Sequence, residues 1–149
     1  MAAFKIPIEI RWSDLDPNFH VKHSSYYDFG AYCRMYFFTE TGTTTQLLLE
    51  HKIGPILLRE ECVFRRELHF GDKVTIDLKM KKATPDFGRW TLVHEIYKNE
   101  EKLSAIITVD GAWLDTNRRK LIAAPAFANK TLDSLERTPD FEWMEQKPG

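Results

Sequence analysis

The sequence predicts an α+β domain in which an antiparallel sheet curls around one long central helix. Three features predict it: an opening strand with alternating apolar side chains, a helix apolar on nearly every side, and at least four later strands. Short turns separate these strands, so they are expected to pair antiparallel. A helix with little polar surface must be covered on most sides, and the sheet has to provide that cover.

The composition is ordinary for a globular domain. With 149 residues, 43% hydrophobic and 29% charged, the chain suits one domain with a sizeable core. The formal net charge of −1 predicts neither nucleic acid nor an anionic membrane as a partner. No apolar run is long enough for a membrane span, and a secretory signal is absent. Cys33 and Cys62 form no metal-ligand pattern and are expected to be free thiols, which favours a cytoplasmic location.

The first strand is expected over residues 4–12, where apolar and polar side chains alternate with a period of two. The long helix is expected over residues 26–40. Ser25 is the predicted N-cap, Asp28 completes a capping box three residues later, and Gly42 lies just past the helix end. The chain from the first strand to the helix end therefore carries clear boundaries.

The second half of the chain has the pattern of an antiparallel meander. A short helix is expected over 43–51, followed by strands over 56–70, 74–81, 90–97, 103–114 and 121–123. The residues after Ala126 lean acidic and predict a terminal helix or a loose tail. The expected division is a domain over 1–126 and a C-terminal segment over 127–149.

The loop between the first strand and the helix, WSDLDPNFHVKHSSY, contains two carboxylates and two imidazoles. Asp14, Asp16, His20 and His23 have the atoms for a metal site, but their spacing matches no familiar zinc pattern. We therefore predict no metal here. The chain also lacks a P-loop, a GxGxxG and a GxSxG motif, so the nucleotide-binding and serine-hydrolase patterns are absent.

A carboxylate just before a helix N-terminus is the chemically suggestive feature that is left. The free N–H groups of the helix start stabilise a developing oxyanion, and the carboxylate acts as a base or nucleophile. This combination suits acyl transfer to water. The alternative is structural, with Asp14 and Asp16 forming Asx-turns that only shape the loop.

At this point the sequence resembles a known family. The run over residues 14–21, followed by Tyr26 and Arg34, resembles the 4-hydroxybenzoyl-CoA thioesterase-like branch of the hotdog-fold thioesterases. The Arg59-Glu60-Glu61 run, the Phe70-Gly71-Asp72 turn and the strand around His94 agree with it. The resemblance covers about residues 4–126.

The resemblance implies a hotdog fold, a homodimer or homotetramer, and an acyl-CoA or acyl carrier protein thioester as substrate. It implies neither a metal nor an organic cofactor. By position, Asp16 matches the catalytic carboxylate, and the backbone N–H at His23 matches the group that polarises the thioester carbonyl. Tyr26 matches the aromatic residue that lines the acyl pocket, and His20 matches a histidine that shapes the loop at the substrate.

The family often has asparagines where this chain has Lys22 and His23. The phosphates of CoA call for basic residues, with Arg favoured for bidentate contacts. Arg89, at a hairpin beside several lysines, is the expected substrate contact, and Arg65 with Arg66 forms a second candidate group. An ordinary solvated strand edge is the alternative for both groups.

Two other functions fit parts of the sequence. A homo-oligomeric hotdog module that binds an acyl thioester without hydrolysing it would keep the fold and most of the loop. A hotdog dehydratase or isomerase is disfavoured, because those relatives use a different, histidine-centred motif. The presence of both Asp16 and the helix start favours the hydrolase.

Overall fold

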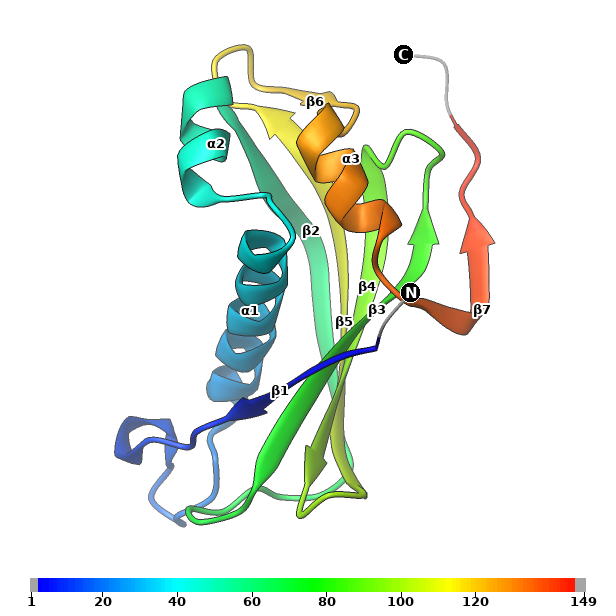
Figure 1. Cartoon of the computed structure of the whole chain (residues 1–149). Helices are drawn as coiled ribbons and strands as arrows, with labels where there is room; N and C mark the ends of the chain where they lie inside the picture. Colours follow the sequence, from blue (N-terminus) through cyan, green and yellow to red (C-terminus); the bar gives the residue numbers. More distant parts are fainter. Residues whose placement is uncertain (1–2, 147–149) are drawn as a thin grey trace.

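The computed structural model describes residues 3–146, and its chain order is a strand, a long helix and a meander of strands (Figure 1). The opening strand is shorter than predicted because the chain turns into a 3-10 helix over Trp12–Asp14. The elements are β1 Phe4–Ile8, α1 His23–Glu40, α2 Thr45–His51, β2 Ile53–Phe64, β3 Val74–Ala83, β4 Arg89–Lys98, β5 Lys102–Asp115, β6 Lys120–Ile122, α3 Ala126–Asp133 and β7 Arg137–Trp143.

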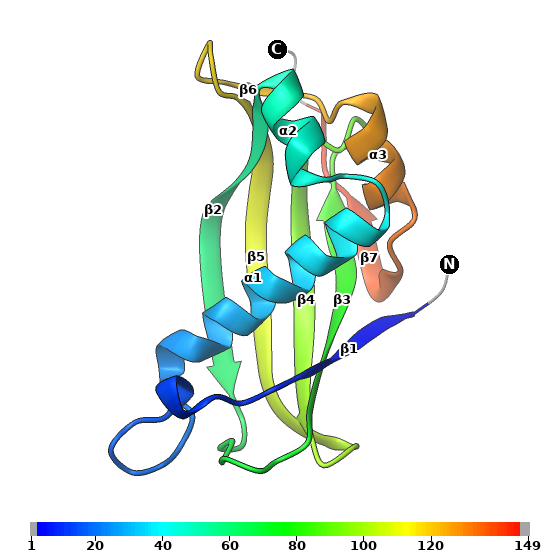
Figure 2. The same cartoon turned by 60° about the vertical axis from the view of Figure 1, so that its left-hand side comes forward.

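The strands form one sheet in the order β1-β3-β4-β5-β2, and β6 adds to β5. All of these neighbours pair antiparallel, which confirms the predicted α+β class with an antiparallel sheet. Figure 2 shows α1 crossing one face of this sheet. No helix of the described residues is long and apolar enough to cross a membrane.

Strand β7 is an addition that the sequence analysis missed. It pairs with β3 in parallel, so the sheet is not antiparallel throughout. The acidic residues that suggested a helix or loose tail lie against lysines of β3, in the pairs Lys81–Asp140 at 3.8 Å and Lys82–Glu142 at 3.3 Å. Tertiary pairing therefore overrides a local pattern with few alternating apolar residues. Residues 147–149 of the predicted tail lie outside the described residues.

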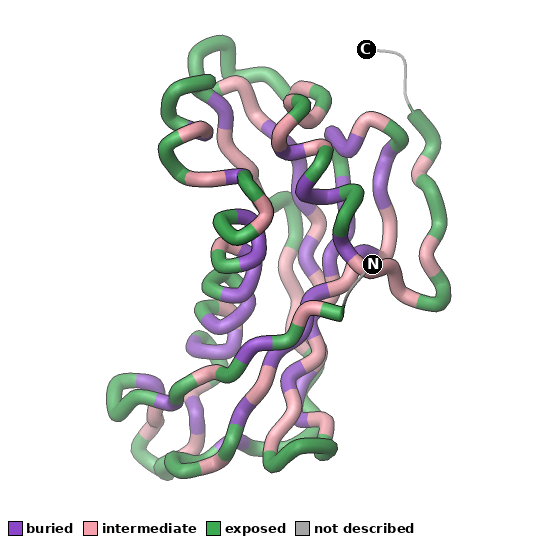
Figure 3. Tube along the Cα trace, in the orientation of Figure 1, coloured by how far each residue is buried: buried purple, intermediate pink, exposed green. Residues whose placement is uncertain are grey.

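Helix α1 buries only the side that faces the sheet. Phe29, Cys33 and Phe37 are in the core, whereas Tyr32 is 55% and Tyr36 is 41% exposed. Figure 3 shows the same division, with buried residues toward the sheet and exposed ones away from it. The nearly all-apolar helix is thus half-covered by its own chain, and its outer side is open.

A buried polar network links α1 to the sheet. One Arg34 guanidinium nitrogen lies 2.9 Å from His94 Nε2, and His94 Nδ1 lies 2.7 Å from the Asp77 carbonyl. A carbonyl only accepts, so Nδ1 carries the proton and Nε2 accepts from Arg34. Burial and the Arg34 charge lower the pKa of His94 to about 3. His94 is therefore neutral and structural.

The Asp77 side chain makes stability depend on pH. Burial raises its pKa to about 6, against the opposing hydrogen bond from the Glu95 N–H at 2.6 Å. Its folded pKa exceeds the unfolded value, so its contribution is most favourable at low pH and is lost as pH rises toward 6. The loss is at most about 3 kcal/mol, since one pKa unit corresponds to about 1.4 kcal/mol.

Urea unfolding of the wild type and Asp77→Asn at pH 4.5 and 7.5 measures this effect. Asn keeps an acceptor for the Glu95 N–H but cannot ionise. We therefore expect the free energy of unfolding of the wild type, relative to that of the variant, to be lower by roughly 1–3 kcal/mol at pH 7.5 than at pH 4.5. An unchanged difference between the two pH values would contradict the assignment.

Candidate active site

The loop between the 3-10 helix and α1 is a compact turn held by its own backbone. The Asp16 N–H donates to the His20 carbonyl at 2.8 Å, and the Phe19 N–H donates to the Asp16 carbonyl at 2.9 Å. Leu15 and Val21 form an isolated bridge across it. Phe19 adopts a φ of 63°, which is uncommon for a residue other than glycine and is a feature that often accompanies functional loops.

The two carboxylate oxygens of Asp16 have different environments. Oδ1 accepts from the Asn18 N–H at 2.9 Å and from the His20 N–H at 3.2 Å. Among the described residues, none donates a hydrogen bond to Oδ2. The Asx-turn of the structural alternative is therefore present, but it uses one oxygen and leaves the other available for chemistry.

Asp14 has a structural environment instead. Its carboxylate is buried and accepts from the Arg11 N–H at 2.8 Å and from the Ser25 hydroxyl at 3.1 Å, while its carbonyl accepts from the Lys22 N–H at 2.8 Å. Burial alone would raise the pKa of Asp14, but these bonds and the Arg11 guanidinium hold it below its usual value. Asp14 thus fastens the loop to the helix start.

The helix starts earlier than predicted. Its N-cap is Lys22 and its first residue is His23, so the expected Ser25 cap and the Ser25–Asp28 capping box are wrong. Ser25 instead lies in the first turn and donates to Asp14, a long-range partner that the local pattern did not show. Among the described residues, the backbone N–H groups of His23 and Ser24 find no acceptor, which leaves donors open at the helix start.

These groups line one pocket of about 320 Å³ at the end of the sheet next to the loop. Four of the five predicted site residues lie there, namely both predicted catalytic residues and two of the three predicted substrate contacts. The lining residues are Asp16, His20, Val21, His23, Tyr26, Phe64, Arg65, Arg66 and Glu67.

The far wall of this pocket comes from the end of β2 and the residues after it. The Tyr26 ring packs edge-on against Phe64 at 4.9 Å between centroids, and burial raises the pKa of the Tyr26 hydroxyl. Arg65 and Arg66 were a candidate group in the sequence, whereas Phe64 and Glu67 were missed. The sequence feature that could have revealed them is the break in the apolar pattern at Arg65. It marks the end of the strand rather than an irregularity within a longer strand.

Arg89 is not brought to this pocket within one chain. It begins β4, at the end of the sheet away from the loop (Figure 1). There it lines a separate pocket of about 610 Å³, with Asp86 and the Met144–Gln146 segment. A contact of Arg89 with a ligand in the Asp16 pocket would therefore need a second copy of the chain.

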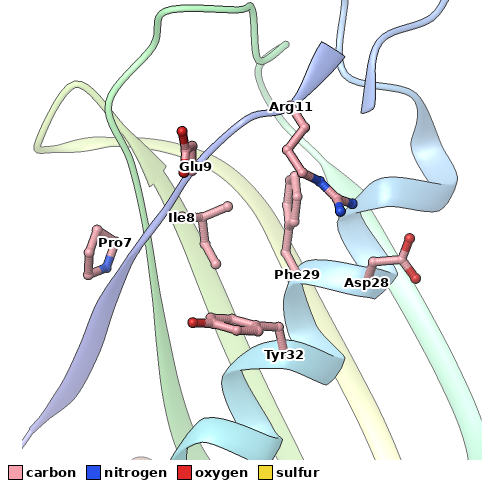
Figure 4. A pocket seen from close by; sticks show the side chains of 7 residues that line it. All are labelled: Pro7, Ile8, Glu9, Arg11, Asp28, Phe29 and Tyr32. Carbon is pink, nitrogen blue, oxygen red and sulfur yellow. The ribbon is translucent and has the colours of Figure 1, made fainter. Parts of the chain in front are cut away.

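A third pocket, of about 540 Å³, lies between β1 and α1 (Figure 4). Its charged groups are less suited to chemistry, because the Arg11 guanidinium is also bonded to Asp14 at 3.3 Å. It contains none of the predicted site residues, so we place the candidate active site in the pocket that contains Asp16. This third pocket is lined by Pro7, Ile8, Glu9, Arg11, Asp28, Phe29 and Tyr32.

A family model described as the thioesterase-like superfamily matches residues 10–135. A search of curated proteins gives no match. Among solved structures, a 1,4-dihydroxy-2-naphthoyl-CoA thioesterase from Synechocystis shares 16% identity over 90% of this chain and 98% of its own, with a TM-score of 0.80.

Two further solved structures are similar in the same way. A Staphylococcus aureus protein in complex with CoA shares 19% identity over 99% of this chain and 95% of its own, with a TM-score of 0.83. A thioesterase from Thermus thermophilus, complexed with coenzyme A and zinc, shares 20% identity over 93% of this chain and 99% of its own, with a TM-score of 0.75. At these identities the likeness shows the fold.

Proposed function

The chain belongs to the thioesterase-like superfamily and is a thioester hydrolase of the hotdog-fold type, and we propose that it hydrolyses an acyl-CoA to a carboxylic acid and free CoA. The observation that carries this proposal is the Asp16 carboxylate, with one oxygen bonded in the loop and the other free, in one pocket with the start of α1. A carboxylate and open helix N–H groups are what hydrolysis of a thioester requires.

In the proposed reaction, the thioester carbonyl lies at the helix start, where the His23 N–H polarises its oxygen. The Asp16 carboxylate takes a proton from the attacking water, or attacks the carbonyl carbon itself and is then released by water. The C–S bond breaks as the tetrahedral intermediate collapses, and the sulfur takes up the proton that Asp16 removed from water, or one from the solvent in the nucleophilic route, and leaves as the thiol. Both routes require the negative charge of Asp16, and neither requires a metal or an organic cofactor.

The same pocket provides basic groups for CoA. The Arg65 guanidinium has no hydrogen-bond or ion-pair partner among the described residues, so it is free to bind a phosphate. Tyr26 and Phe64 form an apolar wall suited to an acyl group. The His20 ring shapes the pocket beside Asp16. The free thiols Cys33 and Cys62 support a reducing, cytoplasmic setting for this activity.

We also propose that the active form is a homodimer or a homotetramer. Strand β2 is an edge of the sheet, paired only with β5 among the described strands, and it exposes a row of apolar side chains. The outer side of α1, with Tyr32 and Tyr36, is open as well. A second copy would cover both and bring new side chains to the pocket at Phe64. The exposed residues of β2 are Leu57, Leu58, Val63 and Phe64.

Sedimentation equilibrium measures the assembly. We expect at least twice the chain mass of 17.5 kDa at micromolar concentration. Leu58→Asp, which introduces a charge on the exposed edge, should shift the protein toward the monomer, and Leu121→Asp on β6 is a matched exposed control. A wild-type monomer at these concentrations would contradict the proposal.

Free-thiol release from short, long, branched and aromatic acyl-CoAs tests the hydrolase itself. Turnover of at least one member, lost on removal of the Asp16 charge, is the expected result. A wild type that is stabilised by acyl-CoA but releases no thiol would instead support the binding module. If thiol were released only from an acyl carrier protein thioester, that thioester would replace acyl-CoA as the proposed substrate, and the proposed reaction would stay the same.

A further inference from the structure

Three potential metal ligands converge beside the Asp16 loop. They are the imidazoles of His20 and His69 and the carboxylate of Glu67, and one potential ligand atom from each lies within 4.8 Å of the other two. His20 Nε2 is 3.3 Å and His69 Nε2 is 3.8 Å from the same Glu67 oxygen, Oε2. The two rings meet edge-on, 4.8 Å between centroids. Two imidazoles and one carboxylate thus point at a common volume.

This set of donors matches the chemistry of a zinc-type ion. Imidazole nitrogens and carboxylate oxygens bind Zn²⁺ at about 2.1 Å, which places tetrahedral ligands about 3.4 Å apart. The two nitrogen–oxygen distances, 3.3 and 3.8 Å, are close to that value, and all three ligand atoms lie within 4.8 Å of one another. Three protein ligands leave a fourth position open for water or a ligand.

A second carboxylate lies behind one of the imidazoles. The Asp72 Oδ2 atom accepts from the His69 backbone N–H at 2.8 Å and lies 3.6 Å from His69 Nδ1. His69 Nε2, the nitrogen that faces Glu67, is therefore the one available to bind a metal ion. A carboxylate behind a histidine ligand is the usual arrangement at metal sites, because it holds the ring and raises its basicity.

The site also joins two segments that are distant in sequence. The His20–His69 pair forms an isolated backbone bridge between the Asp16 loop and the segment after β2, so both imidazoles start from tethered backbone. Tethering lowers the ordering entropy that an ion would have to overcome. Sequence spacing could not reveal the set, because Glu67 and His69 lie outside the loop that carries His20.

We propose that His20, Glu67 and His69 form a binding site for a divalent transition metal ion of the zinc type. The bound ion bridges the Asp16 loop to the segment after β2, at the rim of the candidate active site. It holds His20, whose backbone N–H bonds to Asp16, and so stiffens the loop that carries the carboxylate. The site is independent of the hydrolase proposal, because it requires only these three side chains.

Cobalt and zinc titrations of the chelator-treated full chain test the site directly. We expect one Co²⁺ per chain with visible absorption typical of four- or five-coordinate cobalt, and competition by Zn²⁺ in calorimetry. His69→Ala and Glu67→Gln should each weaken binding at least 10-fold, and Asp72→Asn about 10-fold. His51→Ala, in α2 and stacked on Phe127, is the matched histidine control and should bind like the wild type.

Folding does not confound these variants. The Glu67 side chain is 65% exposed, and His69→Ala keeps the backbone N–H that bonds to Asp72. Circular dichroism should therefore be unchanged while cobalt binding is lost. Equal binding by the wild type and His69→Ala, or no saturable binding by the wild type, would overturn the proposal. Thiol release is not measured in this experiment, so the metal-site proposal and the hydrolase proposal are tested independently.

Discussion

Asp16→Asn is expected to lower thioester turnover by roughly 10³-fold or more while leaving the fold intact. General-base catalysis typically contributes 10²- to 10⁴-fold, and a nucleophilic role would make the loss larger. The amide that replaces Oδ2 can neither accept a proton from water nor attack a carbonyl. Stopped and continuous thiol-release assays at saturating acyl-CoA measure the change in kcat.

The structure explains why stability should be preserved. An Asn side chain keeps an oxygen in the place of Oδ1, which is the atom that accepts from the Asn18 and His20 N–H groups. No described residue donates to Oδ2, so the new amide displaces no hydrogen bond. We expect a melting temperature within about 2 °C of the wild type, as for a typical surface change.

Asp14→Asn is the matched contrast, two residues earlier in the same loop. Its carboxylate is buried and bonded to Arg11 and Ser25, so loss of its charge should lower stability by about 2 kcal/mol. Near-wild-type turnover by Asp16→Asn would overturn the assignment of the catalytic carboxylate. The two variants together separate a loss of chemistry from a loss of loop structure.

The sequence could separate the elements of the fold because each carries its own local period. Alternating residues mark β3, turn residues mark the ends of β4 and β5, and Gly42 at a φ of 100° follows the end of α1 as expected. Strand β7 was not predicted because it is stabilised by long-range ion pairs with lysines on β3. Local patterns do not contain such long-range pairs.

The candidate site also has features that the sequence predicted and features that only the folded chain shows. The motif placed Asp16, His20, His23 and Tyr26 together, and they share one pocket. The resemblance assigned the catalytic role to Asp16, but the residue pattern alone could not separate Asp14 from Asp16, because that depends on which carboxylate is buried against Ser25. The contributions of Phe64 and Glu67 depend on where β2 ends and how the chain returns to the loop, which only the folded chain shows.

Gly111→Ala is expected to destabilise the protein by about 3 kcal/mol or more, the largest stability effect that we predict. Gly111 on β5 is paired across the sheet with Trp90 on β4, and the indole covers the glycine. A Cβ at position 111 would overlap the six-membered ring of Trp90. Overpacking in a rigid core typically costs about 1–3 kcal/mol, and this overlap is severe.

Trp90 is held in the core by its neighbours. Its side chain is 1% exposed and packs edge-on against the equally buried Trp113, with 6.4 Å between ring centroids. The sheet or both indoles must therefore shift to accept one methyl group. Gly54→Ala on β2 is the matched control, because a Cβ there would meet only a Thr116 methyl at 4.0 Å. It should change stability by less than about 1 kcal/mol.

A double-mutant cycle tests the cause of the loss rather than only its size. In a Trp90→Leu background the shorter side chain no longer reaches over position 111, so Gly111→Ala should cost less than about 1 kcal/mol. Urea unfolding of the four proteins gives the coupling energy directly. If Gly111→Ala cost the same with Trp90 and with Leu, the indole would not be the obstacle, and the need for glycine would lie in the backbone of β5 itself.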